Sequence, residues 1–259
     1  MDSVEYHQAV ALLDWQVELG ATEAICDSPV NRYELPAAME KPKAPTAVAP
    51  GKPELFRPRQ ADPVAEAERA AAGASTLEDL RAALAGFEHC ELRKGARNLV
   101  FSDGIAGAPL MVVGEAPGRQ EDRAGRPLIG PAGQMLDRML AAIGMGRDRA
   151  EAPVYIANVL PWRPPQGRDA SAEEIAMMRP FMLRHIALAG PKALVLIGNT
   201  SCETLLEKRG ITRLRGQWAE VAGIPALPML HPAYLLRNPA AKRESWADLL
   251  SLQARLRDG

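Results

Sequence analysis

Three short segments of the chain carry residue types that could together bind a planar, amide-like ring. They are the turn 114–118 (GEAPG), the amide side chain of Asn158 and the imidazole of His231. An asparagine amide can donate and accept hydrogen bonds along one edge, which fits a base with adjacent N–H and C=O groups. An imidazole N–H can stabilise negative charge that develops on a carbonyl oxygen. Together these residue types indicate ring recognition and stabilisation of a charged group.

Each of these segments also has a purely structural interpretation. Asn158 could equally cap a turn or a helix, and a histidine that follows a strand is more often structural than catalytic. The GEAPG sequence alone fits any tight connection that is rich in glycine and proline. Only the combination, in this order along the chain, indicates a site.

Apolar segments precede all three positions and predict the strands that would hold them. We expect strands over 108–113, 152–160, 192–197, 217–221 and 226–230, with an edge segment at 98–102. Helical spacing predicts helices over 76–85, 132–143, 171–189, 201–207 and 243–256. The predicted fold class is therefore α/β, a three-layer α/β/α sandwich with a central, mostly parallel sheet. Parallel strands end at one edge of the sheet, so the turn, the amide and the imidazole should meet there.

Composition divides the chain into three parts. Residues 1–34 form an N-terminal helical segment, with a helix over 4–19 whose Leu12 and Trp15 should pack on another element. Residues 35–74 are rich in Pro, Ala, Lys and Glu and contain too little apolar surface to fold, so we expect a linker. Residues 75–259 form the globular domain that carries the three site segments.

The overall composition restricts the class of protein. The 259 residues are 47% hydrophobic and carry a formal net charge of −1, so any nucleic-acid contact must come from a local basic patch. Cys26, Cys90 and Cys202 are widely spaced and odd in number, which indicates a reducing compartment without a disulfide framework. The polar first residues predict no signal peptide, and no apolar run approaches the roughly 20 residues of a membrane span. We therefore expect a cytoplasmic protein.

Read together, the motifs resemble those of the family 4 uracil-DNA glycosylases. The matching segments are GEAPG with a following ED, GRP and G-x-AG, then NVLPWRPP, then HPAYLLR, and the resemblance covers roughly residue 88 to the C-terminus. The resemblance implies a parallel sheet between helices and a monomer that acts on uracil-containing DNA in base excision repair. Such an enzyme flips uracil out of the stack and hydrolyses its N-glycosidic bond, leaving an abasic site.

The resemblance also assigns roles to the three segments. Asn158 matches the asparagine that reads the uracil edge, and His231 matches the histidine that faces uracil O2 and stabilises the departing anion. Glu115 matches a glutamate implicated in catalysis, which would stabilise the cationic sugar or help to orient water. Ala116 occupies the position of a water-activating aspartate in other uracil glycosylases. Catalysis should therefore depend on leaving-group stabilisation and positioning rather than on a strong general base.

Further positions follow from the same motifs. The resemblance implies a substrate pocket that also includes Gly114, Ala116, Pro117, Gly118, Glu121 and Leu128. Contacts to DNA are expected from Arg119, Arg163, Arg168, Tyr234, Leu235, Leu236 and Arg237. Within this second group, the leucines are candidates for insertion into the duplex and the arginines for phosphate contacts.

The chain departs from the family at the cluster ligands. Family 4 enzymes hold a 4Fe–4S cluster with four cysteines, and here only Cys90 matches a ligand position. Phe87, Trp162 and Met178 occupy the other three. One thiolate cannot hold a cluster that normally takes four. We therefore expect no cluster and no other metal or cofactor, with the three replacements forming an apolar plug that braces the same loops.

A second departure lies in the pocket. Leu128 stands where the family usually has a phenylalanine that stacks on the base. Base–aromatic stacking contributes about 1–3 kcal/mol, and leucine offers apolar contact with less geometric discrimination. The substitution therefore predicts greater tolerance of other damaged bases.

Alternative functions remain open from the sequence. The rival to a monofunctional glycosylase is a non-catalytic binder of uracil-containing or abasic DNA. A nucleotide-binding protein that uses GEAPG as a phosphate cradle ranks last, because the spacing of known phosphate loops is absent. The segment 166–171 (QGRDAS) lacks the histidine with which a related branch bonds covalently to uracil, so we expect no such trapping.

Overall fold

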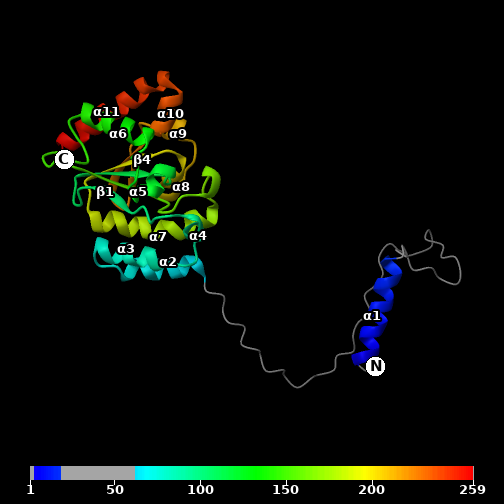
Figure 1. Ribbon diagram of the computed structural model, residues 1–259. Coiled ribbons are helices and arrows are strands. Elements are labelled where there is room, and N and C mark those ends of the chain that lie inside the picture. Colours follow the sequence, from blue (N-terminus) through cyan, green and yellow to red (C-terminus); the bar gives the residue numbers. More distant parts are fainter. Residues whose placement is uncertain (1–2, 19–61, 259) are drawn as a thin grey trace, which may run out of the picture. The chain divides into compact units, whose positions relative to one another are not determined.

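The computed structural model describes residues 3–18 and 62–258. The chain divides into two units, residues 1–57 and 58–259. In the first unit, α1 (Ser3–Glu18) confirms the predicted N-terminal helix (Figure 1). Leu12 and Trp15, which we expected to pack on another element, are 60% and 57% exposed. The rest of the predicted N-terminal segment and residues 35–61 of the predicted linker lie outside the described residues.

The second unit is built on a six-stranded sheet in the order β1-β3-β2-β4-β6-β5. The four central strands are parallel, whereas β1 and β5 lie antiparallel at the two edges. This arrangement confirms the predicted mostly parallel sheet. The strands are β1 (Ser102–Gly104), β2 (Leu110–Gly114), β3 (Val154–Asn158), β4 (Ala193–Ile197), β5 (Ala219–Val221) and β6 (Ile224–Met229).

Helices cover both faces of the sheet (Figure 1). One face packs on α6 (Pro131–Ala142), α10 (Pro232–Arg237) and α11 (Lys242–Asp258). The other packs on α7 (Ala172–Ala189) and α8 (Asn199–Leu206), with α3 (Leu77–Gly86) beyond α7. Strands β2, β3 and β4 are buried along their whole length, which explains their continuous apolar sequences. Short helical turns complete the domain: α4 (Leu92–Gly95), α5 (Arg119–Ala124), η1 (Pro165–Gly167), α9 (Ile211–Leu214) and η2 (Pro239–Ala241).

The predicted linker 35–74 is wrong at its C-terminal end, because residues 63–73 form a helix. Helix α2 (Pro63–Gly73) is capped at its N-terminus by Asp62, whose carboxylate accepts a hydrogen bond from the backbone N–H of Val64 at 3.0 Å. Its buried Ala67 and Ala71 face the core, and the helix packs against α7. Alanines bury little surface individually but allow two helices to approach closely. The folded domain therefore includes α2 rather than beginning at residue 75.

The edge segment predicted at 98–102 is displaced toward the C-terminus, where β1 pairs with β3. Val100 instead donates a backbone hydrogen bond to the Pro161 carbonyl at 2.8 Å. None of the helices in the described ranges is long and apolar enough to cross a membrane.

Candidate active site

The predicted site residues lie near the end of β2. At this strand the order of the sheet switches, because β3 lies on one side of β2 and β4 on the other. Strand β2 lies between β3 and β4, and ligands in open α/β sheets bind at the carboxyl ends of such strands. Glu115 follows β2, and its Oε1 accepts a hydrogen bond from the backbone N–H of Thr200 at 2.9 Å. This carboxylate thus lies at the N-terminus of α8, where the helix dipole favours negative charge. Gly198, with φ of 91°, makes room for it, since a Cβ there would approach the Glu115 carboxyl to 2.6 Å.

Asn158 is the most unusual polar group of the site. It ends β3, opposite Gly114 at the end of β2, and is 4% exposed. Neither its Oδ1 nor its Nδ2 has a hydrogen-bond partner among the described residues. Leaving one buried polar group unsatisfied costs roughly 1–3 kcal/mol, so two on one side chain indicate a function.

Gly114 provides the space that Asn158 needs. A Cβ at Gly114 would overlap with Asn158 Oδ1 and would lie 3.3 Å from Cδ1 of Leu128. The amide and the leucine side chain therefore both lie against the backbone of this glycine. The sequence motif contains all three residues, but it does not reveal this convergence.

His231 presents a neutral imidazole, and its Nε2 has no hydrogen-bond partner among the described residues. Its Nδ1 accepts a hydrogen bond from the backbone N–H of Ala233 at 3.1 Å, as the N-terminal cap of α10. The neutral ring therefore carries its proton on Nε2. Burial lowers the pKa of His231 below its ordinary value of 6.5, although the Glu115 carboxylate opposes this effect. At neutral pH the ring is uncharged and can donate from Nε2.

A pocket of about 310 Å³ opens beside these groups. Its lining residues are Ala116, Gly118, Arg119, Gln120, Glu121, Leu128, Gly130, Pro131, Ala132 and His231. The structure therefore brings Ala116, Gly118, Glu121, Leu128 and His231 together as predicted, with Arg119 beside them. Gln120 and the segment 130–132 were missed, although Gln120 lies between the GEAPG and ED motifs and the segment lies within the G-x-AG motif.

Glu121 lines this pocket but is also bonded to the backbone. Its Oε1 accepts hydrogen bonds from the N–H groups of Ile129 at 3.1 Å and Gly130 at 2.8 Å. The carboxylate thereby ties α5 to the loop that precedes α6. The neighbouring Asp122 accepts from the N–H groups of Arg97 and Asn98 at 2.8 and 3.2 Å. Both acidic residues of the ED motif thus organise loops.

The expected DNA contacts divide into exposed and engaged residues. Arg119 is exposed at the pocket, and Arg163 is partly buried. Arg168 instead forms two hydrogen bonds with the Glu174 carboxylate, at 2.8 and 2.5 Å, and this guanidinium lowers the pKa of Glu174. Its guanidinium is therefore already paired with a carboxylate in this structure.

In α10, only part of the YLLR segment faces solvent. Tyr234 is 36% and Leu236 41% exposed, and Arg237 is also exposed. Leu235 is fully buried in the core with α6 and α11, so its expected insertion into a duplex does not fit this structure. Helical geometry turns adjacent side chains to different faces, so both leucines cannot point outward.

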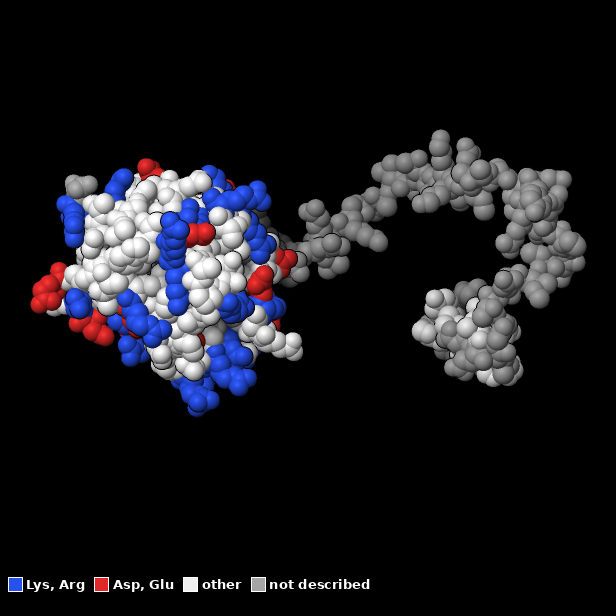
Figure 2. Space-filling view, turned by 90° about the horizontal axis from the view of Figure 1, so that it is seen from above, with Lys and Arg blue, Asp and Glu red and all other residues white. Residues whose placement is uncertain are grey.

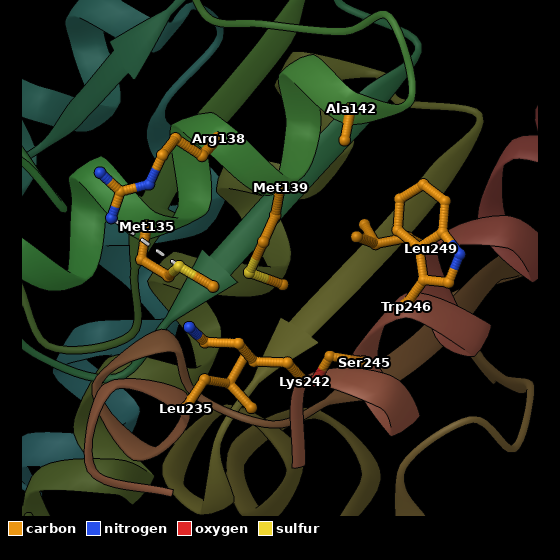
Figure 3. A pocket seen from close by; sticks show the side chains of 9 residues that line it. All are labelled: Met135, Arg138, Met139, Ala142, Leu235, Lys242, Ser245, Trp246 and Leu249. Atoms are coloured by element: carbon orange, nitrogen blue, oxygen red, sulfur yellow. Dashed lines mark hydrogen bonds between the residues drawn. The ribbon is translucent and has the colours of Figure 1, made fainter. Parts of the chain in front are cut away.

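Basic side chains gather on the side of the domain that carries α6, α10 and α11. Figure 2 looks onto this side, where Lys and Arg lie around and across a largely uncharged surface and Asp and Glu are fewer. A groove of about 380 Å³ between α6 and α11 is lined by apolar groups such as Met135 and Trp246, with the cationic Arg138 and Lys242 (Figure 3). No motif in the sequence predicts this groove, and Leu235 is the one predicted site residue among those that line it.

The four positions that the resemblance matches to cluster ligands lie in one apolar core. Phe87, Cys90, Trp162 and Met178 are all buried there, and the Phe87 ring packs edge-to-face on Phe181 with centroids 5.2 Å apart. Burial raises the pKa of the Cys90 thiol, which favours the neutral form over the thiolate that metals bind. The described residues contain no cluster of three or more His, Cys, Asp or Glu side chains suited to a metal ion. This donor set does not fit an iron–sulfur cluster.

Comparison with known proteins identifies the family to which the chain belongs. The sequence model of the uracil DNA glycosylase superfamily matches residues 101–250. The type-4 uracil-DNA glycosylase of Pyrobaculum aerophilum is 33% identical over 182 residues, which cover 67% of this chain and 91% of the relative. The type-4 enzyme of Sulfurisphaera tokodaii is 35% identical over 178 residues, 65% of this chain and 79% of the relative. That of Thermotoga maritima is 36% identical over 152 residues, 58% and 77% respectively. The chain belongs to the uracil DNA glycosylase superfamily.

Proposed function

We propose that this protein is a monofunctional uracil-DNA glycosylase of base excision repair. The observation that carries the proposal is the buried Asn158 amide, whose donor and acceptor atoms both lack partners within the part of the chain that the structure describes. Uracil carries an adjacent N–H and C=O on one edge, and the two amide atoms complement them. His231, whose Nε2 has no hydrogen-bond partner among the described residues, lines the adjoining pocket together with Leu128 and suits the second task of the reaction.

The chemistry needs stabilisation of charge at two points. When the bond between uracil and C1′ of the sugar breaks, its electron pair leaves with the base, and negative charge collects on O2. The His231 Nε2–H donates a hydrogen bond to that oxygen. Water then attacks C1′ and its proton passes to solvent or to the departing base, leaving an abasic site. Ala116 cannot act as a base, so positioning and leaving-group stabilisation drive the step.

Glu115 contributes an electrostatic role in this proposal. Its carboxylate lies close enough to His231 to influence the imidazole pKa. The same negative charge would favour the cationic sugar that forms as the bond breaks. Since Oε1 already accepts from Thr200, the carboxylate is held in place rather than free to turn.

We further propose that the enzyme works without an iron–sulfur cluster. Phe87, Trp162 and Met178 would brace the surrounding loops by apolar packing, in place of metal–thiolate bonds. The exposed Arg119, Tyr234, Leu236 and Arg237 are the candidates for DNA contact. With Leu128 beside Asn158, the pocket would accept further damaged bases besides uracil. We also propose that the protein is a monomer and that it works in the cytoplasm.

A cleavage assay on a defined oligonucleotide tests the function. The protein is incubated with a duplex that contains one uracil, and a matched duplex with thymine serves as the control. We expect strand cleavage at the uracil only after alkali treatment, because a monofunctional enzyme leaves an intact abasic strand. Cleavage without alkali would contradict the monofunctional assignment. Binding to abasic DNA without any cleavage would favour the non-catalytic alternative.

A further inference from the structure

The backbone of Leu128 adopts a conformation that leucine rarely takes. Its φ is 50°, in the left-handed region, and its side chain is 6% exposed. Such a residue persists only when its surroundings hold it there, and residues of this kind cluster at functional sites. The groups that hold Leu128 therefore bear on the pocket beside it.

Arg147 holds the two carbonyl groups on either side of this strained position. It lies before β3 and is 7% exposed. Its Nη2 donates to the Leu128 carbonyl at 2.9 Å, and its Nη1 donates to the Pro127 carbonyl at 3.2 Å. A guanidinium presents its donors in a rigid fork, so two successive carbonyls can be fixed by one side chain.

Two carboxylates hold the guanidinium in turn. Arg147 Nη1 donates to Asp103 of β1 at 2.5 Å, and Nε donates to Asp137 of α6 at 2.9 Å. The arginine thus connects an edge strand, a helix and the pocket loop. Its three nitrogens are all engaged, which is the arrangement that a buried arginine needs.

The opposite side of the same loop is held by Glu121. This carboxylate accepts from the N–H groups of Ile129 and Gly130, so the carbonyls of 127–128 and the amides of 129–130 are fixed from two sides. The backbone of Gly133 lies directly against the Leu128 carbonyl, because a Cβ at this glycine would overlap with that carbonyl. Little freedom is left for the Leu128 backbone.

We propose that Arg147 is a positioning residue for base excision, which it supports by fixing Leu128 beside Asn158 without touching the base. Leu128 Cδ1 and Asn158 Oδ1 both lie against Gly114, so a change in the Leu128 backbone alters the surface next to the reading amide. The inference rests on the proposed glycosylase function of this pocket. A reacting group displaced by about 1 Å can lose about 100-fold in rate, so a loosened loop should slow excision.

The experiment compares Arg147→Met with a matched control, Arg126→Met. Arg126 pairs with the same Asp103 at 3.0 Å but is 55% exposed and is not bonded to the pocket carbonyls. Single-turnover excision of uracil is measured well below the melting temperature of each variant, together with affinity for abasic DNA. Amide hydrogen exchange at Ile129 and Gly130 reports directly on the loop.

We expect Arg147→Met to slow excision by about tenfold or more while affinity for abasic DNA changes little. Exchange at Ile129 and Gly130 should accelerate in this variant, and Arg126→Met should match the wild type in all three measurements. Arg147→Lys should recover little, because one ammonium cannot span two carbonyls and two carboxylates. If Arg147→Met does not fold, Asp137→Asn takes its place and should shift the same measurements in the same direction.

The outcomes separate this inference from the proposed function. Wild-type excision by folded Arg147→Met, or an equal loss in Arg126→Met, would overturn the positioning role while leaving the glycosylase intact. If the wild type itself releases no uracil, the proposed function fails, and the exchange measurement still tests whether Arg147 holds the loop. Unchanged protection of Ile129 and Gly130 in Arg147→Met, or in Asp137→Asn where that variant is used, would refute it.

Discussion

Replacing His185 with glutamine should remove a large part of the acid sensitivity of the fold. His185 lies in α7 and is 2% exposed. Its ring stacks on Phe101 with centroids 4.4 Å apart, and its Nε2 shares a hydrogen bond with the Tyr155 hydroxyl at 2.9 Å. The ring is shielded from the solvent that a charged imidazole needs, so burial lowers the pKa of His185 to about 4.

The sign and size of the effect follow from proton linkage. The ordinary pKa of histidine is 6.5, so between pH 6.5 and 4 the unfolded chain takes up a proton that the folded protein excludes. Stability therefore falls as the pH drops through this window and stops falling below the folded pKa. Since one pKa unit corresponds to about 1.4 kcal/mol, the loss is about 2 kcal/mol at pH 5 and about 3 kcal/mol at pH 4.

Urea unfolding at pH 7 and pH 5 measures this directly. The difference in the free energy of unfolding between the two pH values should be about 2 kcal/mol smaller in His185→Gln than in the wild type. The exposed His89 supplies the control, and His89→Gln should keep the wild-type difference. An unchanged pH dependence in His185→Gln would refute the reasoning that burial keeps this imidazole neutral.

Other predictions concern the iron content, the protonation of His231, the packing of α2 and the base selectivity of the pocket. Protein purified without oxygen should contain no stoichiometric iron and no absorption band near 400 nm, because Cys90 is the only cysteine at a ligand position. Since burial lowers the pKa of His231, the excision rate should hold at neutral pH and fall only in solutions more acidic than the ordinary histidine pKa. Ala67→Asp should destabilise the domain by roughly 3 kcal/mol in urea unfolding, while Ala72→Asp on the exposed side of α2 should change little. Leu128→Phe should raise the preference for uracil over other damaged bases in parallel excision assays.

Each of these has a result that would contradict it. Stoichiometric iron would contradict the proposal that the enzyme works without a cluster. An excision rate that rises on acidification would contradict the proposal that His231 acts as a neutral imidazole. Equal stability of the two aspartate variants would contradict the packing of α2 on α7. Unchanged base selectivity in Leu128→Phe would mean that residue 128 does not discriminate between bases.

The sheet and the pocket could be predicted because strong local signals carry them. Continuous apolar segments identify β2, β3 and β4, and the glycine-rich turn after β2 marks the ligand edge. The motifs also contain Glu121, Leu128 and His231, which line one pocket in the structure. Each strand signal lies within a short stretch of sequence, and the meeting of the distant motifs follows from the common edge at which parallel strands end.

The features that sequence reasoning missed depend on contacts between distant residues. Helix α2 has a composition that predicts a linker. It forms a helix because Ala67 and Ala71 face the core and the helix packs on α7. The burial of Leu235 depends on the rotation of α10 against α6. Arg147 lies in an ordinary polar loop, and nothing near it in the sequence indicates that it reaches residues 127 and 128.

The most direct test of the account is the release of free uracil by three proteins. Single-turnover release from a uracil-containing duplex is measured for the wild type, Asn158→Ala and His231→Ala, with affinity for abasic DNA measured in parallel. We expect the wild type to release uracil and His231→Ala to lose about 100- to 1,000-fold in rate while still binding abasic DNA. Asn158→Ala should lose its preference for uracil over other bases. Wild-type rates and selectivity in both variants would contradict the assignment of this pocket as the site of uracil excision.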